Sequence, residues 1–286
     1  MKKLLTIILA VLISFASLPV YAFAKDVLDI KENRIAEQET AEVTDSAEEP
    51  VVYAAASSSG GQWVQESNGR WWYKHADGSY TKYNWEYING SRYYFNSSGR
   101  MVRETLVQGK RTYNFLSSGE LNSTIMAIDR IYQGNTNWCW AASAAMIGNY
   151  ENGTSLTMQD VVTNVKGSLL DEGATTDEEK KALRYALPGK EIKTLQKNQI
   201  KFDTFAWYAN KNHPVFATVQ FYTLEPNFHA LVYLGYDRET ESVQVIDPAF
   251  NHPEYIEYSQ LMNNFPFKAT NGEVYHAETI YIHVYP

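Results

Sequence analysis

The pattern of apolar and polar positions changes three times along this chain of 286 residues. A nearly continuous apolar run comes first, and a polar, acidic stretch without a sustained period follows it. Aromatic residues then alternate with polar ones to about residue 123, and beyond about Ile128 helical and strand-like patterns are mixed. We therefore divide the chain into segments 1–24, 25–60, 61–123 and 126–286.

The pattern in the last segment predicts helices in its first part and strands in its second part. Helical patterns follow Asn137 and recur over three ranges, Thr157–Lys166, Thr176–Leu187 and Asp203–Asn210. Thr176 and Glu179 have the spacing of a capping box. Apolar runs bounded by turn residues predict strands at Pro214–Phe221, Ala230–Tyr236, Ser242–Ile246 and Glu278–Val284. This order is typical of an α+β domain in which a helical part is followed by an antiparallel sheet.

The first segment has the features of an export signal. Two lysines precede the apolar run Leu4–Leu18, and the pattern Ala22-Phe23-Ala24 offers a cleavage point before Lys25. An uncleaved signal anchor is the alternative. No cysteine lies near this junction, which argues against a lipoprotein, and no later apolar stretch is long enough to span a bilayer. We expect a secreted, extracellular protein with no integral membrane span after signal cleavage.

Segment 25–60 has the composition of a disordered acidic linker. Nine acidic and three basic residues lie between Lys25 and Pro50, and a spacer rich in Ala, Ser and Gly ends the segment. The net charge of the whole chain is −8. This argues against a nucleic-acid partner, because neutralising phosphates requires clustered Lys and Arg.

Segment 61–123 contains an internal repeat. Asn68–Tyr73 is followed 21 residues later by Asn89–Phe95, and a weaker copy, Gln108–Phe115, follows after 19 more. Each copy places Gly in one turn and ends in a second, at Asp77-Gly78, Ser98-Gly99 and Ser118-Gly119. The pattern predicts one small β-hairpin per repeat. Because one hairpin cannot bury its own rings, the hairpins of this all-β module must stack on one another.

The copies resemble the cell-wall-binding repeats of Gram-positive surface proteins, of the choline-binding and glucan-binding type. The resemblance implies a bacterial cell-wall polymer as partner, through teichoic-acid choline or a glycan. It also implies aromatic cages for such a ligand, for which the candidate residues are Trp63, Trp71, Trp72, Trp85 and Tyr93. The alternative for each ring is that it only packs against its neighbours. The third copy has no tryptophan, as expected of a repeat that caps the stack.

The chain has one cysteine, Cys139, which cannot form an internal disulfide. In an exported protein a lone thiol is either a buried, inert side chain or a nucleophile. Asn137 is a good N-cap, and the Ala-rich run after Cys139 favours a buried helix. Cys139 would then lie in the first helical turn, where the helix dipole favours the reactive thiolate.

A cysteine nucleophile needs a base, and His229 is the best placed candidate. It precedes a predicted strand, and Asp247 ends the next one. A hairpin centred on Arg238 places His229 opposite Asp247 at its open end, where the carboxylate would orient the imidazole. The other histidines are His75, in the repeats, and His213, His252, His276 and His283. None of these has an acidic partner placed by local structure.

Three motifs together carry a second resemblance. The pattern Gln133-x5-Cys139-Trp140, the later strand that begins His229-Ala-Leu-Val, and the sequence Val-Ile-Asp247-Pro resemble the papain-like cysteine peptidases. The closest likeness is to bacteriocin-leader-processing peptidases and papain-like effector proteases of plant pathogens. The resemblance implies that Cys139 is the nucleophile, His229 the base and Asp247 the orienting residue. It also implies that Gln133 and the Cys139 backbone N–H form an oxyanion hole.

The sequence therefore predicts a secreted, wall-associated cysteine peptidase that hydrolyses protein or peptide substrates through a Cys-His-Asp triad. No His-Glu-x-x-His pattern or phosphate-binding Gly loop is present in the sequence, so we expect no metal and no cofactor. One alternative is a peptidoglycan hydrolase, either an endopeptidase or an amidase. Another is a catalytically inactive surface adhesin.

Overall fold

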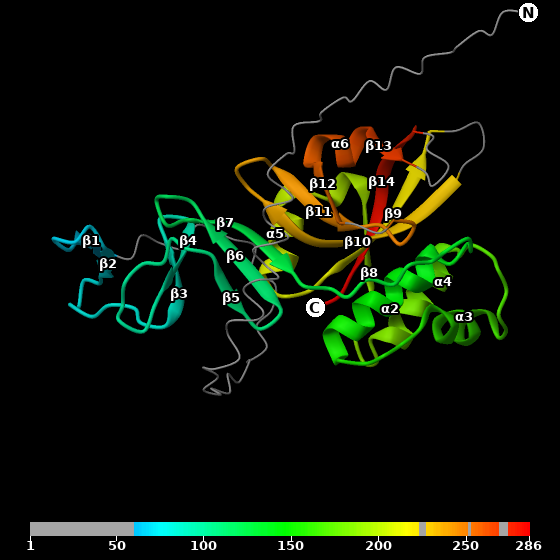
Figure 1. Ribbon diagram of the computed structural model, residues 1–286, viewed down its shortest axis with the longest axis horizontal. Helices are drawn as coiled ribbons and strands as arrows, with labels where there is room; N and C mark the ends of the chain where they lie inside the picture. Colours follow the sequence, from blue (N-terminus) through cyan, green and yellow to red (C-terminus); the bar gives the residue numbers. More distant parts are fainter. Residues whose placement is uncertain (1–59, 223–226, 251–252, 269–273) are drawn as a thin grey trace, which may run out of the picture. The chain divides into compact units, whose positions relative to one another are not determined.

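The computed structural model describes residues 60–222, 227–250, 253–268 and 274–286. The predicted signal peptide and residues 25–59 of the predicted linker lie outside these ranges. Within them the order of elements is that of an α+β domain preceded by small β-hairpins, as the sequence predicts (Figure 1).

Each repeat forms one antiparallel hairpin. The hairpin strands are β1 (Gln62–Gln65) with β2 (Trp71–Lys74), β3 (Asn84–Ile88) with β4 (Ser91–Phe95), and β5 (Leu106–Gln108) with β6 (Arg111–Phe115). The glycines of the hairpin turns have positive φ, with values of 81° at Gly69, 85° at Gly90 and 58° at Gly109. Glycine adopts this left-handed conformation without a steric cost, which explains the regular spacing of these residues.

The third hairpin continues into the large sheet. Strand β7 (Leu121–Met126) pairs with β6 on one side and with β10 (Asn227–Asp237) on the other. The sheet has ten strands, all of whose pairings are antiparallel. Its remaining strands are β8 (Lys193–Gln196), β9 (Val215–Phe221), β11 (Ser242–Ile246), β12 (Pro253–Glu257), β13 (Phe265–Lys268) and β14 (Val274–Val284). The last repeat and the following domain therefore share backbone hydrogen bonds rather than a flexible junction.

Alternate residues of β10 face two different cores. The even-numbered residues from Ala230 to Tyr236 pack in a cluster with α2 (Cys139–Asn152), α3 (Met158–Lys166) and α4 (Thr176–Ala186). Leu231 and Tyr233 pack in the other cluster, with α5 (Phe202–Asn210) and α6 (Tyr258–Asn263). A strand with both faces buried reads as the continuous apolar run seen in the sequence.

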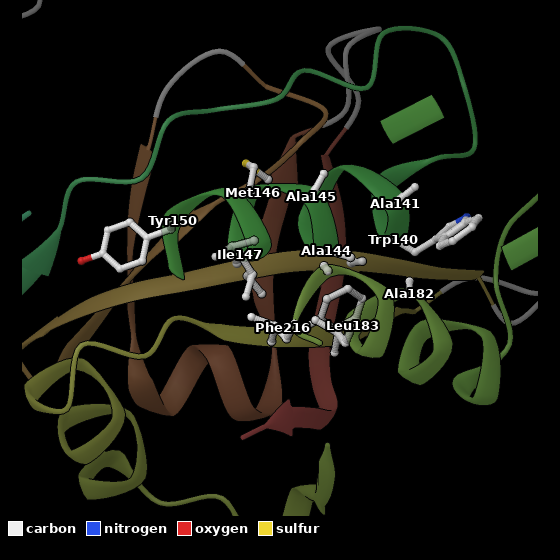
Figure 2. Close-up of a cluster of buried hydrophobic side chains, with 14 of the residues drawn as sticks. Trp140, Ala141, Ala144, Ala145, Met146, Ile147, Tyr150, Ala182, Leu183 and Phe216 are labelled. Carbon is white, nitrogen blue, oxygen red and sulfur yellow. The ribbon is translucent and has the colours of Figure 1, made fainter. Parts of the chain in front are cut away.

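Helix α2 is the buried centre of the first cluster. Its alanines at 141, 142, 144 and 145 are fully buried, which confirms the prediction of a central helix. Figure 2 shows Ala182 and Leu183 of α4 beside α2, and Phe216 of β9 in the same cluster. At Gly148 an added Cβ would lie 2.8 Å from the Cβ of Ala186, so the small side chain lets the two helices approach closely.

Three local predictions were wrong by one or two residues. The N-cap of α2 is Trp138 rather than Asn137, and no side chain caps this helix. The capping box of α4 pairs Thr175 with Glu178, whereas Glu179 is buried. The hairpin of β10 and β11 pairs Val232 with Ile246, so its numbers sum to 478 rather than 476, and a bulge follows. The polar turn between these strands is therefore centred beyond Arg238.

Candidate active site

Cys139 is the first residue of α2 and is half-buried. The residue before it, Trp138, has no side-chain oxygen, and the first turn of α2 carries no acidic residue. No side-chain cap or acidic residue of this turn therefore offsets the positive electrostatic potential of the free N–H groups at the start of α2. A thiolate at the helix start is stabilised by that potential.

His229 and Asp247 lie together at the end of the hairpin, as predicted. His229 belongs to β10, Asp247 follows β11, and His229 Nε2 is 2.7 Å from Asp247 Oδ1. Both side chains are buried. The contact forms despite the two-residue error in register, because a shift of two keeps both side chains on the same face of the hairpin. Diagonal neighbours on one face remain within reach of a long side chain.

The His229 side chain also makes a hydrogen bond with Cys139. Burial alone would lower the pKa of His229, but the Asp247 carboxylate and the charge of Cys139 hold this pKa above its usual value. The imidazolium form is thus favoured between two groups that become anionic. The Phe221 ring stacks on the imidazole at a centroid distance of 6.2 Å and helps to fix the plane of the ring.

Asp247 is held by its own loop. Its Oδ1 also accepts a hydrogen bond from the Ala249 N–H at 2.7 Å, and its carbonyl accepts one from the Phe250 N–H. Arg130, from the segment before α2, donates to the Phe250 carbonyl. Burial lowers the pKa of the Arg130 guanidinium, and the nearby Asp247 and Glu254 carboxylates oppose that effect. Sequence reasoning missed Arg130, since nothing local connects it to a loop 120 residues further on.

Gln133 lies in the loop before α2 and is tied to the Asp247 loop. Its backbone N–H donates to the Pro248 carbonyl at 2.9 Å. Its side-chain Nε2 donates to the Thr136 carbonyl at 2.7 Å, and the Thr136 hydroxyl returns a hydrogen bond to the Gln133 carbonyl. The buried Oε1 has no hydrogen-bond partner among the described residues. A primary amide has two N–H groups, so Nε2 keeps one donor beyond the bond to Thr136.

A segment after α3 flanks the start of α2 and was also missed. The Leu170 carbonyl accepts from Trp138 Nε1 at 2.8 Å, and the Glu172 carbonyl accepts from Trp140 Nε1 at 3.1 Å. Asp171 accepts from the Asn137 backbone N–H at 2.6 Å. The tryptophans on either side of Cys139 are thereby anchored. The only signal for this segment in the sequence was that a buried indole N–H group needs a hydrogen-bond partner.

Three of the other histidines have acidic partners, and for His213 and His283 these lie far away in the sequence, where local patterns do not place them. His213 Nδ1 lies 2.8 Å from Glu151, His283 Nε2 lies 3.2 Å from Glu179, and His75 lies 3.6 Å from Glu86 in the first two repeats. No cysteine accompanies them, because the chain has only Cys139. His252 lies outside the described residues.

Three of the candidate ligand-binding rings, Trp63, Trp85 and Tyr93, pack between neighbouring hairpins. Trp63 contacts Tyr93 of the next repeat edge-on at 4.9 Å, and Trp85 contacts Tyr113 of the third at 4.7 Å. Trp72 contacts Tyr80 at 5.1 Å within its own repeat. Trp63, Trp72 and Trp85, which are all half-buried, therefore have a packing role.

Within the part of the chain that the structure describes, no group of three or more potential metal ligands occurs. A separate search of the same residues reveals no helix with the length and apolar character needed to cross a membrane.

A helix that begins with the cysteine and packs on an antiparallel sheet carrying a His–Asp pair defines a papain-like peptidase fold. The family comparison agrees: residues 125–273, more than half of the chain, match the Peptidase_C39 like family, and the chain belongs to this family. Residues 83–124 match the choline-binding repeat. A comparison with curated proteins finds no match.

Similar solved structures are modular cell-wall proteins. The Cpl-1 endolysin, solved with a peptidoglycan analogue, is 30% identical over 28% of this chain and 22% of its own, with a TM-score of 0.21. The choline-binding domain of Spr1274 from Streptococcus pneumoniae is 42% identical over 21% of this chain and 78% of its own, with a TM-score of 0.19. The LytC autolysin from the same organism is 20% identical over 26% of this chain and 22% of its own, with a TM-score of 0.13. The chain thus spans about a fifth of the length of the endolysin.

Proposed function

We propose that this protein is a secreted cysteine peptidase that hydrolyses peptide bonds through Cys139, His229 and Asp247. The observation that supports this most is the buried His229–Asp247 pair, 2.7 Å apart, whose imidazole also hydrogen-bonds to the cysteine at the start of α2. Membership of a peptidase family supports the same reaction class.

The raised pKa of His229 favours a thiolate–imidazolium pair before substrate binds. The Cys139 thiolate attacks the carbonyl carbon of the scissile bond, and a tetrahedral intermediate forms. His229 gives its proton to the leaving amine, the C–N bond breaks, and an acyl-enzyme thioester remains. His229 then accepts a proton from water, whose oxygen displaces Cys139 and releases the carboxylic acid. Asp247 holds the imidazole in the required tautomer throughout.

The negative oxygen of the tetrahedral intermediate needs preorganised donors. We assign this role to the Cys139 backbone N–H and the remaining N–H of Gln133 Nε2. The bonds from Gln133 to Thr136 and Pro248 support the assignment, since they fix both the amide and its backbone. Donors held in place before the reaction cost no reorganisation when charge develops.

The repeats would hold the enzyme at a bacterial surface. The match to the choline-binding repeat supports attachment to a cell-wall polymer, and the apolar, lysine-preceded start of the chain supports export. In this reading residues 61–123 bind the wall and residues 126–286 carry out the chemistry, with β7 connecting them.

A second candidate is a peptidoglycan hydrolase, which the presence of wall-binding repeats favours. The two can be separated by incubating the full chain with casein and with purified peptidoglycan, beside a Cys139→Ala variant. Release of casein peptides that requires Cys139 supports the peptidase. Cys139-dependent release of wall fragments without casein digestion supports the hydrolase instead. Failure on both substrates, with no reaction of the thiol, points to an inactive adhesin.

A further inference from the structure

The three repeat hairpins present equivalent residues on one face, as their registers show. The residue opposite the tyrosine that recurs in each hairpin is Trp63 in the first, Trp85 in the second and Leu106 in the third, facing Tyr73, Tyr94 and Tyr113. Two residues before each tyrosine stand Trp71, Arg92 and Arg111. The alternation of a β-strand places these residues on the same face as the tyrosines. The first repeat thus carries an indole where the other two carry a cation.

Arg92 lies on the indole of its own hairpin. Its guanidinium carbon is 4.2 Å from the Trp85 ring centroid and 5.8 Å from that of Tyr87. Its Nε is buried with no hydrogen-bond partner, and no carboxylate forms an ion pair with Arg92 among the described residues. The aromatic faces are therefore the main contacts of this cation. A desolvated cation over tryptophan is the most favourable form of this interaction.

Three other rings pack against Trp85, which is half-buried. Phe115 stacks on it at 5.8 Å, and Tyr94 and Tyr113 contact it at 5.1 and 4.7 Å. Its Nε1 donates to Gln108 at 3.2 Å. Arg92 therefore occupies the ring face of Trp85 that an external cation would need.

We propose that Arg92 is the cation bound by Trp85, so that the second repeat carries its ligand position filled by its own side chain. Recognition of an external quaternary ammonium then falls to the first repeat, where Trp71 replaces the arginine. A quaternary ammonium and a guanidinium use the same ring face, so they exclude each other. This inference rests on the proposed wall attachment and specifies which repeat performs it.

The third repeat differs again. Arg111 lies 5.5 Å from the Tyr113 centroid, and its Nη1 donates to the Asn210 carbonyl at the end of α5 at 3.1 Å. Lys110, in the same turn, donates to the Tyr150 carbonyl near the end of α2 at 3.0 Å. These two cations connect the third hairpin to α2 and α5. This hairpin has no tryptophan that could bind a ligand.

In the first repeat Trp71 is half-buried, and no arginine or lysine lies over its ring in the residues that the structure covers. Its carbonyl accepts a hydrogen bond from the Met101 N–H at 2.7 Å, which fixes the strand. Trp63 lies on the same face of the hairpin but is covered by Tyr93 and Phe95. Of the two tryptophans on this face of the first hairpin, Trp71 is therefore the one whose ring an external cation can use.

The test is titration of the full chain with choline chloride, with stoichiometry from calorimetry and binding followed by tryptophan fluorescence. We expect one site in the wild type, at least tenfold weaker binding in Trp71→Ala, and one additional site in Arg92→Ala. Arg103→Ala, which removes an exposed arginine that lies over no ring, is the matched control and should leave the stoichiometry unchanged. Arg92→Gln provides a second variant if the alanine variant misfolds, and circular dichroism checks both.

Unchanged stoichiometry in both Arg92 variants would overturn the inference. It would also be overturned if Trp85→Phe abolished choline binding while Trp71→Ala left choline binding unchanged. The proposed attachment can fail separately. If the wild type binds neither choline nor isolated cell walls but Arg92→Ala binds choline, the filled site stands and the attachment does not.

Discussion

The described part of the α+β domain contains two buried histidine–carboxylate pairs, and their neighbours differ. His229 and Asp247 are 2.7 Å apart beside Cys139, whereas His283 and Glu179 are 3.2 Å apart between α4 and the sheet. Both pairs are buried. The comparison shows that a buried His–acid pair alone does not identify an active site.

The neighbours of each pair account for the difference. Glu179 accepts hydrogen bonds from Thr218 and from the Tyr281 hydroxyl at 2.8 Å, and His283 Nδ1 contacts Thr194 at 2.9 Å. Burial and the charge of Glu179 raise the pKa of Tyr281 to about 12, so this hydroxyl stays protonated and donates. These contacts join α4 to β9 and β14, and β8 to β14. The imidazole of His229 instead meets a thiol at the start of a helix.

The largest effect that separates the two pairs is expected for Asp247→Asn. Activity should fall by about 10⁴-fold, because the amide no longer selects the His229 tautomer that accepts and donates at the cysteine. The measurement is casein hydrolysis under substrate-limited conditions, with Asp203→Asn as an exposed control. Activity within tenfold of wild type would mean that Asp247 serves only the turn before Pro248.

Glu179→Ala should act on stability and leave the thiol chemistry alone. Removing the carboxyl leaves its partners on β9 and β14 unsatisfied, at a cost of about 3–5 kcal/mol in the free energy of unfolding. Urea unfolding measures this, and Glu191→Ala, at an exposed carboxylate, should change it by less than about 0.5 kcal/mol. A stable variant that loses Cys139 reactivity would make the two pairs functionally alike.

A smaller effect is expected for Gln133→Ala. Loss of one oxyanion donor should lower kcat about 10²- to 10³-fold with little change in KM, because the bond forms only in the transition state. Gln159→Ala, at an exposed glutamine of α3, is the control. A change confined to KM would place Gln133 in substrate binding rather than in the oxyanion hole.

The smallest effect concerns stability against pH. Because the folded pKa of His229 is raised, its contribution is complete below about pH 6.5, the unfolded pKa, and is lost as pH rises through the folded value. The free energy of unfolding should therefore decline above pH 6.5 by at most about 1.4 kcal/mol per pH unit from this group. Urea unfolding across pH should show a shallower decline in His229→Ala. Identical slopes would contradict the raised pKa.

Local sequence patterns predicted those parts of the candidate site that depend on a single helix or a single hairpin. Cys139 at a helix start and His229 beside Asp247 followed from one helix and one hairpin, and an even register error left the side chains on one face. The hairpin repeats followed from glycine spacing. The positions of Arg130 and the Leu170–Glu172 segment could not be predicted from local patterns, because both reach the site from distant parts of the chain.

The continuity of the third repeat with the large sheet was also beyond sequence reasoning. The third copy keeps the glycine and tyrosine positions of the other two, and no local feature predicts that β7 pairs with β10. Likewise, the arginine at position 92 is visible in the sequence, but its place over Trp85 depends on the hairpin register and the side-chain geometry.

The central claim is that His229 activates Cys139, and the pH dependence of iodoacetamide alkylation tests it most directly. Wild type and His229→Ala are compared, with His283→Ala as the control at the other pair. Fast alkylation that persists well below pH 8 in the wild type and in His283→Ala, and is reduced in His229→Ala, is the predicted result. A profile like that of a free thiol near pKa ~8.5 in all three proteins, or no reaction in any, would contradict the account.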